Sequence, residues 1–173
     1  MNEPVFSIHP ARPADVAVIL AMIRELAEYE RLSHQVTATE ERLHSALFDG
    51  HSVAHAIVAR TADGTPAGFA LYFFNFSTFL AQPGLYLEDL FVRPAFRRHG
   101  LGRRLLVHLA TIAVERNCGR MEWSVLDWNE TALKVYRAIG AVPMDEWTIQ
   151  RLTGQALADL AAGATAVPPP SPA

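Results

Sequence analysis

The positions of the apolar residues along the chain predict an alternation of strands and helices. Spacings of three and four residues are typical of a helix with one buried face, whereas short continuous or alternating apolar runs are typical of strands. Helices are predicted over residues 13–29, 37–50, 101–115 and 129–138, and strands over residues 5–8, 53–60, 68–76, 86–92, 121–126 and 147–152. This order predicts a single α/β domain with a mixed sheet.

Two local signals refine these boundaries. Thr37 and Glu40 have the spacing of a capping box, which predicts that the second helix begins there. Pro83-Gly84 predicts a break in the chain before the strand over residues 86–92. The helix over residues 101–115 should bury one stripe of its surface, made by Leu101, Leu105, Leu109 and Ile112.

Size and composition are those of one globular domain. The chain has 173 residues, half of them hydrophobic, and its tail from Val167 to Ala173 is mostly proline, which predicts disorder there. Cys118 is the only cysteine, so no intramolecular disulfide is possible, and a buried structural thiol is favoured over a nucleophile. Since neither a signal peptide nor an apolar run long enough for a bilayer is found, a cytoplasmic protein without membrane contact is expected.

Charge is distributed unevenly along the chain. Residues 1–91 carry a net charge of −6, whereas residues 92–173 carry +3. Such a division suits a site that holds a polyanion on one side and a cation on the other, although random variation of surface charge explains it equally well. The histidines have no metal-ligand spacing, so no metal site is expected.

The segment 97–102, Arg-Arg-His-Gly-Leu-Gly, lies between a predicted strand and a predicted helix. A helix N-terminus presents unpaired N–H groups, and glycines let the backbone approach a ligand closely. Five arginines gather here, namely Arg93, Arg97, Arg98, Arg103 and Arg104, so a pyrophosphate is a reasonable ligand.

Other ligands fit this segment less well. A dinucleotide fingerprint needs a third glycine, and a P-loop needs Gly-Lys followed by Ser or Thr; both are absent. Nucleic acid is disfavoured because the basic run lacks interleaved aromatic residues and the rest of the chain is not basic.

Taken together, four regions resemble the GNAT superfamily of N-acetyltransferases, and within it the diamine (spermidine/spermine) N-acetyltransferase family. These regions are residues 26–30, 86–92, the glycine motif at 97–102, and residues 128–141. The resemblance covers about residues 6–152. It implies a GNAT-like domain over residues 1–152, with a central, mostly antiparallel sheet flanked by helices, a C-terminal extension over residues 153–173, and a homodimer.

The resemblance also implies acetyl-CoA as the co-substrate. Backbone N–H groups near Leu90, Phe91 and Val92 would hold the acetyl and pantetheine part, and Asn129 and Tyr136 would contact the cofactor as well. The pyrophosphate side would be formed by Arg97, Arg98, His99, Gly100, Leu101, Gly102 and Arg103. From the residues alone, Asn129 also fits the N-cap of its helix, and both roles are compatible.

Two residues would carry the chemistry. Tyr136 would give a proton to the departing thiolate, and Glu88 would draw a proton from the ammonium; the alternatives are a packed tyrosine and an ion pair with an arginine. Glu88 shares a face with Leu90 and Val92 if the strand pleat is regular, which turns Asp89 to the other face and favours a structural role for it.

The acceptor would be a small cationic amine bound by Tyr29, Glu30 and Glu88, such as a polyamine, a diamine or a lysine-like amino acid. Residues 77–84 and 143–147 depart from the family pattern, which leaves the identity of the amine open. A peptide or protein amine and a non-catalytic acyl-CoA-binding module remain as alternatives.

Overall fold

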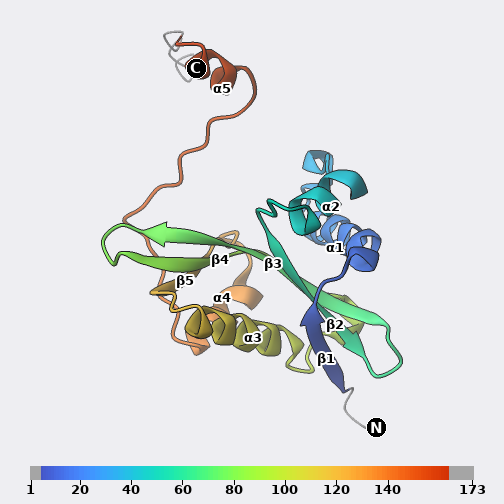
Figure 1. Ribbon diagram of the computed structural model, residues 1–173. Helices are drawn as coiled ribbons and strands as arrows, with labels where there is room; N and C mark the ends of the chain where they lie inside the picture. Colours follow the sequence, from blue (N-terminus) through green and yellow to red (C-terminus); the bar gives the residue numbers. More distant parts are fainter. Residues whose placement is uncertain (1–4, 164–173) are drawn as a thin grey trace. The chain divides into compact units, whose positions relative to one another are not determined.

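The computed structural model describes residues 5–163 of the chain (Figure 1). The predicted disorder over residues 167–173 lies outside this range. The chain divides into two compact units, residues 1–132 and residues 133–173.

The first unit is built on one five-stranded sheet with the strands in sequence order. The strands are β1 (Phe6–Pro10), β2 (His55–Thr61), β3 (Pro66–Ser77), β4 (Gln82–Val92) and β5 (Arg120–Trp123). The pairs from β1 to β4 are antiparallel, and β4 pairs with β5 in parallel. The predicted mixed, mostly antiparallel sheet is therefore confirmed.

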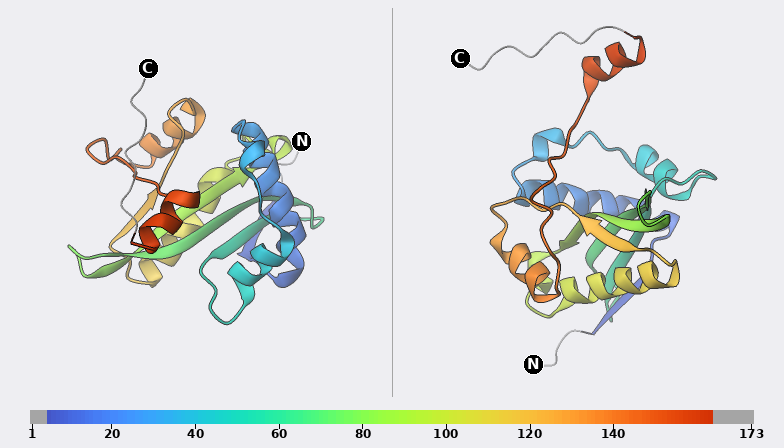
Figure 2. Two further views of the ribbon diagram at one scale, coloured as in Figure 1. Left: turned by 90° about the horizontal axis from the view of Figure 1, so that it is seen from above. Right: turned by 90° about the vertical axis from the view of Figure 1, so that its left-hand side faces the viewer.

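Helices cover both faces of this sheet (Figures 1 and 2). Helices α1 (Val16–Tyr29) and α2 (Glu40–Phe48) pack on one face, over a core that includes Phe69 and Phe91. Helix α3 (Leu101–Glu115) packs on the other face and has contacts with β1, β3, β4 and β5. Three of its four predicted stripe residues, Leu101, Leu105 and Leu109, are almost completely buried, and Ile112 is half-buried.

The capping box predicted at Thr37 is wrong. Helix α2 begins at Glu40, and its N-cap is Thr39, whose hydroxyl accepts a hydrogen bond from the backbone N–H of Arg42 at 3.3 Å. Thr39 has the extended backbone of an N-cap, and both threonines are good caps, so their identity alone could not decide between them. Short 3-10 turns, η1 (Pro13–Asp15) and η2 (Ser33–Gln35), flank α1.

The sequence predicts a break in the chain at Pro83-Gly84. This prediction is wrong, because both residues lie within β4. The turn between β3 and β4 falls earlier, where Ala81 has a positive φ of 52°. Pro83 is tolerated because it lies near the start of the strand, and its carbonyl accepts a hydrogen bond from the N–H of Gly119 at 2.8 Å. Gly84 is required for close packing, since a Cβ there would overlap Oδ1 of Asn75 on β3.

In the second unit, α4 (Glu130–Ala138), which begins in the first unit, is followed by an irregular segment and then by α5 (Gly154–Ala161). The strand predicted over residues 147–152 is wrong, because these residues form no strand pairing in the described part of the chain. Their alternating apolar pattern satisfies only the local requirement for a strand, which also needs a neighbouring strand for its hydrogen bonds. Between residues 5 and 163, no helix is long and apolar enough to cross a bilayer.

Candidate active site

The glycine motif forms an open turn at the start of α3. Gly100 is the N-cap residue and has a left-handed backbone with φ of 71°, and no side chain caps the helix. A Cβ on Gly100 would meet no atom within 4 Å, so the space above this turn is open. The first N–H groups of α3 have no side-chain cap and lie at the positive end of the helix dipole, which suits an anion.

Four of the five arginines that the sequence gathers here divide into two groups, and the fifth, Arg97, donates a hydrogen bond to the carbonyl of Val92. Arg93 binds the carboxylate of Glu25 on α1, with N–O distances of 2.6–3.2 Å, and Arg104 donates to the carbonyl of Phe6 at 2.7 Å. Arg98 and Arg103 are exposed, and their side chains make no hydrogen bond or ion pair with residues 5–163. Two arginines of the five are thus left for a phosphate at the helix N-terminus.

The edge of β4 opens beside this turn. Pairing with β5 extends only from Gly84 to Leu87, and in the described chain the stretch from Asp89 to Val92 pairs with β3 alone. Alternate residues of an edge strand direct their N–H and C=O groups away from the sheet. The backbone of Leu90, Phe91 and Val92, predicted to hold the acetyl and pantetheine part, therefore lies at an unpaired edge.

A β-bulge lies at Glu88. Asp89 pairs with Leu71 of β3 and Leu87 pairs with Tyr72, so Glu88 is an extra residue without a partner on β3. The pleat is therefore not regular, and the condition under which Glu88 shares a face with Leu90 and Val92 is not met. Asp89 lies on the same face as Leu71 and Phe91, toward α1, while Glu88 is exposed at the bulge.

Three carboxylates gather at this bulge. Burial, together with the nearby charges of Glu88 and Glu30, raises the pKa of Asp89 to about 6. Burial also raises the pKa of Glu30, the residue that follows the last turn of α1. Like charges at close range in a half-buried place are unfavourable unless a cation neutralises them, so this cluster is suited to an ammonium group.

Asp89 is the functional candidate that the sequence reasoning did not identify. Alternation within a regular strand assigns Glu88 to the site and turns Asp89 away from it, and the bulge removes that premise. The available signal is the pair of adjacent acidic residues in an otherwise apolar strand. One of two such neighbours must face a packed helix in a regular strand, whereas a bulge lets both reach the same edge.

Tyr29, the last residue of α1, joins several predicted site residues. Its hydroxyl donates to Oδ1 of Asn129 at 3.4 Å, and its ring lies 5.7 Å from the ring of Trp128. Asn129 in turn accepts a hydrogen bond from the N–H of Ala132 at 3.3 Å, which confirms its predicted role as the N-cap of α4. A predicted substrate residue and a predicted cofactor residue are thus in direct contact.

Tyr136 lies on the part of α4 that belongs to the second unit. Its role as the acid for the departing thiolate stays a prediction, as does its contact with the cofactor. Tyr136 has an interaction within the protein.

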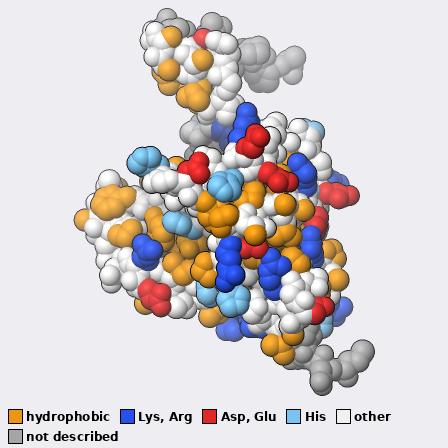
Figure 3. Space-filling model, turned by 45° about the vertical axis from the view of Figure 1, so that its right-hand side comes forward, with side chains coloured by type: hydrophobic (Ala, Val, Ile, Leu, Met, Phe, Trp, Pro, Cys, Tyr) orange, Lys and Arg blue, Asp and Glu red, His pale blue; other side chains and the backbone are white. Residues whose placement is uncertain are grey.

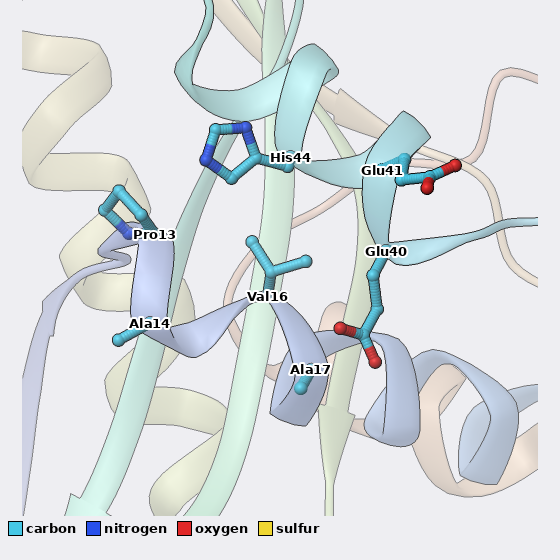
Figure 4. A pocket seen from close by; sticks show the side chains of 7 residues that line it. All are labelled: Pro13, Ala14, Val16, Ala17, Glu40, Glu41 and His44. Carbon is cyan, nitrogen blue, oxygen red and sulfur yellow. The ribbon is translucent and has the colours of Figure 1, made fainter.

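A surface hollow lies elsewhere. It has a volume of about 550 Å³ and is formed by the start of α1 and by Glu40, Glu41 and His44 of α2 (Figure 4). It is open and contains none of the predicted site residues.

On the face in Figure 3, acidic and basic side chains are intermixed without the continuous basic stripe typical of nucleic-acid binding. Within residues 5–163, no three His, Cys, Asp or Glu side chains are grouped as a metal site would require.

A strand with an open, bulged edge, followed by a glycine turn at a helix N-terminus, is suited to an acyl-CoA, and the carboxylates beside it are suited to a cationic acceptor. Comparison with known proteins agrees: residues 19–141 match the acetyltransferase (GNAT) family, and the chain belongs to that family. It is an N-acetyltransferase, and the family implies acetyl-CoA as its co-substrate.

Individual relatives extend over nearly the whole chain. The thialysine N-epsilon-acetyltransferase of Bos taurus is 38% identical over 164 residues, covering 89% of this chain and 96% of the relative. The L-ornithine N5-acetyltransferase of Arabidopsis thaliana is 35% identical, covering 87% and 85%. Among solved structures, an integron cassette protein from the mobile metagenome of V. cholerae aligns with a TM-score of 0.75 and 32% identity, covering 90% of this chain and 97% of that chain. The predicted resemblance and fold are thereby confirmed.

Proposed function

We propose that this N-acetyltransferase acts on small acceptors that carry two or more amines, namely diamines, polyamines or lysine-like amino acids. The observation that carries the proposal is the group of three carboxylates, Glu30, Glu88 and Asp89, at the bulge of β4 beside the open edge of that strand. One carboxylate serves the reacting amine, and the other two attract a second positive charge. The acceptors named for the relatives, thialysine and ornithine, have this chemistry.

The acetyl group reaches the amine by direct transfer in a ternary complex. The amine nitrogen attacks the thioester carbon of acetyl-CoA, the carbon–sulfur bond breaks, and the new amide loses one proton. Open N–H groups along β4 from Leu90 to Val92 suit the thioester and pantetheine. Arg98, Arg103 and the turn at Gly100 suit the pyrophosphate.

Asp89 is the better placed proton acceptor of the two neighbouring acids. Its raised pKa of about 6 makes it a stronger base than an ordinary aspartate, and it lies on the α1 face with Glu30. Glu88 at the bulge then serves mainly to bind the acceptor. Tyr136 supplies the proton that the thiolate takes up on leaving. The ammonium form of the acceptor loses two protons in all: one passes through Asp89 to solvent before the attack, and the second replaces the proton that Tyr136 has given up, so the whole reaction releases one proton.

The sharpest test of this function is an acceptor panel with acetyl-CoA, read as the release of free thiol. Diamines, polyamines, lysine, ornithine and thialysine are compared with monoamines and with peptides that have a free N-terminus. We expect a kcat/KM at least about tenfold higher for acceptors with two cationic groups, since one desolvated ion pair is worth roughly 1.4 kcal/mol or more. Exclusive activity on peptide N-termini would contradict the proposal and favour the protein-amine alternative.

Two variants, Glu88→Gln and Asp89→Asn, distinguish the role of proton acceptor from that of acceptor binding. Because Asp89 must be ionised to accept a proton, the activity of the wild type should rise as the pH increases through about 6. Asp89→Asn should lower kcat at every pH and abolish this rise. Glu88→Gln should raise KM for the acceptor and keep that rise. The reverse pattern would return the role of proton acceptor to Glu88.

We also propose that the protein is a homodimer, as the sequence resemblance implies. Three large apolar side chains at the end of the β3–β4 hairpin support an interface: Phe76 is 61% exposed, Phe79 94% and Leu80 51%. Light scattering at micromolar concentration should give twice the mass of 19.1 kDa. A monomer under these conditions would contradict this assignment.

A further inference from the structure

The side chain of Arg97 is turned back onto the protein. Its Nε donates a hydrogen bond to the carbonyl oxygen of Val92 at 2.8 Å. The guanidinium carbon lies 4.9 Å from the centre of the Tyr29 ring and 5.5 Å from the centre of the Phe91 ring. These distances are those of cation–π contacts, which fix the position of the guanidinium on two aromatic surfaces.

These contacts connect the two segments that supply the acidic acceptor site. Tyr29 is the last residue of α1 and is followed directly by Glu30. Phe91 lies on the same face of β4 as Asp89, two residues away. The guanidinium of Arg97 therefore lies between the end of α1 and the end of β4. Its loss would leave Tyr29 supported only by Trp128 and Asn129 among the contacts described above.

The neighbouring arginine has different surroundings. Arg98 has a positive φ of 67°, is exposed, and makes no side-chain hydrogen bond or ion pair with residues 5–163. The two consecutive arginines of this motif therefore have different contacts. One is bound within the protein, and the other is available to a phosphate at the N-terminus of α3.

We infer that Arg97 is a positioning residue for the amine acceptor, and that its side chain is not a ligand of the cofactor. By holding Tyr29 against the end of β4, it sets Glu30 at the correct separation from Asp89. The inference rests on the proposed function, because it assumes that Glu30 and Asp89 bind the acceptor. It assigns the phosphate contact of this motif to Arg98 and to the backbone of the turn.

Arg97→Gln and Arg98→Gln form a matched pair for the test, because each removes one positive charge from adjacent positions. The dissociation constant of acetyl-CoA is measured by calorimetry, and KM for a diamine is measured at saturating acetyl-CoA. A cation–π contact and a hydrogen bond to a charged group together predict that Arg97→Gln raises KM about 5–30-fold and changes acetyl-CoA affinity less than about twofold. Arg98→Gln should weaken acetyl-CoA about 5–30-fold and change KM less than about twofold.

Two further variants keep the inference testable if Arg97→Gln unfolds. Arg97→Lys keeps the charge and loses the planar group, and Tyr29→Leu removes the ring; both should raise KM as Arg97→Gln does. Adding Tyr29→Leu to an Arg97 variant should raise KM by less than the product of the two single effects, because the two residues act through one contact. Equal loss of acetyl-CoA affinity in Arg97→Gln and Arg98→Gln, with KM unchanged, would overturn the inference. Failure of the wild type to acetylate any diamine would instead refute the proposed function.

Discussion

Replacing Asp89 by Asn should stabilise the protein and impair catalysis at the same time. The wild-type carboxyl has a pKa of about 6 in the folded state and an ordinary value near 3.8 when it is exposed. Because folding makes this group harder to ionise, its charge destabilises the folded state fully above pH 6. The destabilisation disappears as the pH falls below the unfolded value. Asparagine has nearly the same shape and carries no charge.

The difference between the two pKa values sets the expected size of the effect. One pKa unit corresponds to about 1.4 kcal/mol, so the full difference between about 6 and 3.8 corresponds to about 3 kcal/mol. Asp89 is half-buried, and water screens part of its charge. A gain of about 1–3 kcal/mol in the free energy of unfolding at pH 8 is therefore expected for Asp89→Asn, shrinking to about half of that value at pH 5.

Urea unfolding of the wild type and the variant at pH 8 and pH 5 measures this gain, and the same samples are assayed for thiol release. Loss of a proton acceptor is worth about 10²–10⁴-fold, so kcat should fall by roughly that factor. Glu88→Gln is the matched control: Glu88 is exposed, and removing its charge relieves only the smaller part of the strain on Asp89, so it should stabilise the protein less than Asp89→Asn does. An Asp89→Asn protein that is no more stable than the wild type at pH 8, or that gains equally at both pH values, would refute the reasoning.

Four further outcomes follow from the same structure. Tyr136→Phe should lower kcat about 10²–10⁴-fold with little change in melting temperature or acetyl-CoA affinity, and a folded variant with normal kcat would exclude an acid role where chemistry limits the rate. Gly100→Asp should abolish acetyl-CoA binding, because it places a negative charge and a strained left-handed residue at the open turn; unchanged affinity in a folded protein would contradict that site. Glu30→Lys should raise KM for diamines more than it lowers kcat, and an effect on kcat alone would count against acceptor binding. Gly84→Ala should destabilise the protein by about 1–3 kcal/mol in urea unfolding, and adding Asn75→Ala should recover part of this loss, because the added methyl group collides with that side chain.

The helices and most strands of the first unit follow from local pattern. Residues 13–29 and 101–115 have an apolar stripe at helical spacing, and both form helices that bury this stripe. The glycine turn is predictable for a similar reason, since Gly100 adopts the left-handed backbone that favours glycine. In these segments, neighbours along the chain decide the conformation.

The failures occur where the decision depends on residues that are distant in sequence. Gly84 suggests a break until its close contact with Asn75 is known. Residues 147–152 have the pattern of a strand and lack a partner in the described chain. The bulge at Glu88 depends on the register between β3 and β4, which strand periodicity cannot report. The face on which Asp89 lies therefore required the structure.

The single extra residue in β4 also lies directly after the point where the pairing with β5 ends. The apolar pattern of β5 continues to Leu126, but pairing with β4 stops at Trp123, opposite Leu87 and directly before the bulge. Deleting Glu88 would leave the faces of all other β4 residues unchanged, since Leu87 and Asp89 already pair with adjacent residues of β3. It would, however, let the two strands continue side by side and close their hydrogen bonds on each other. One inserted residue thus keeps the second half of a sheet edge reserved for a molecule that is not part of the chain.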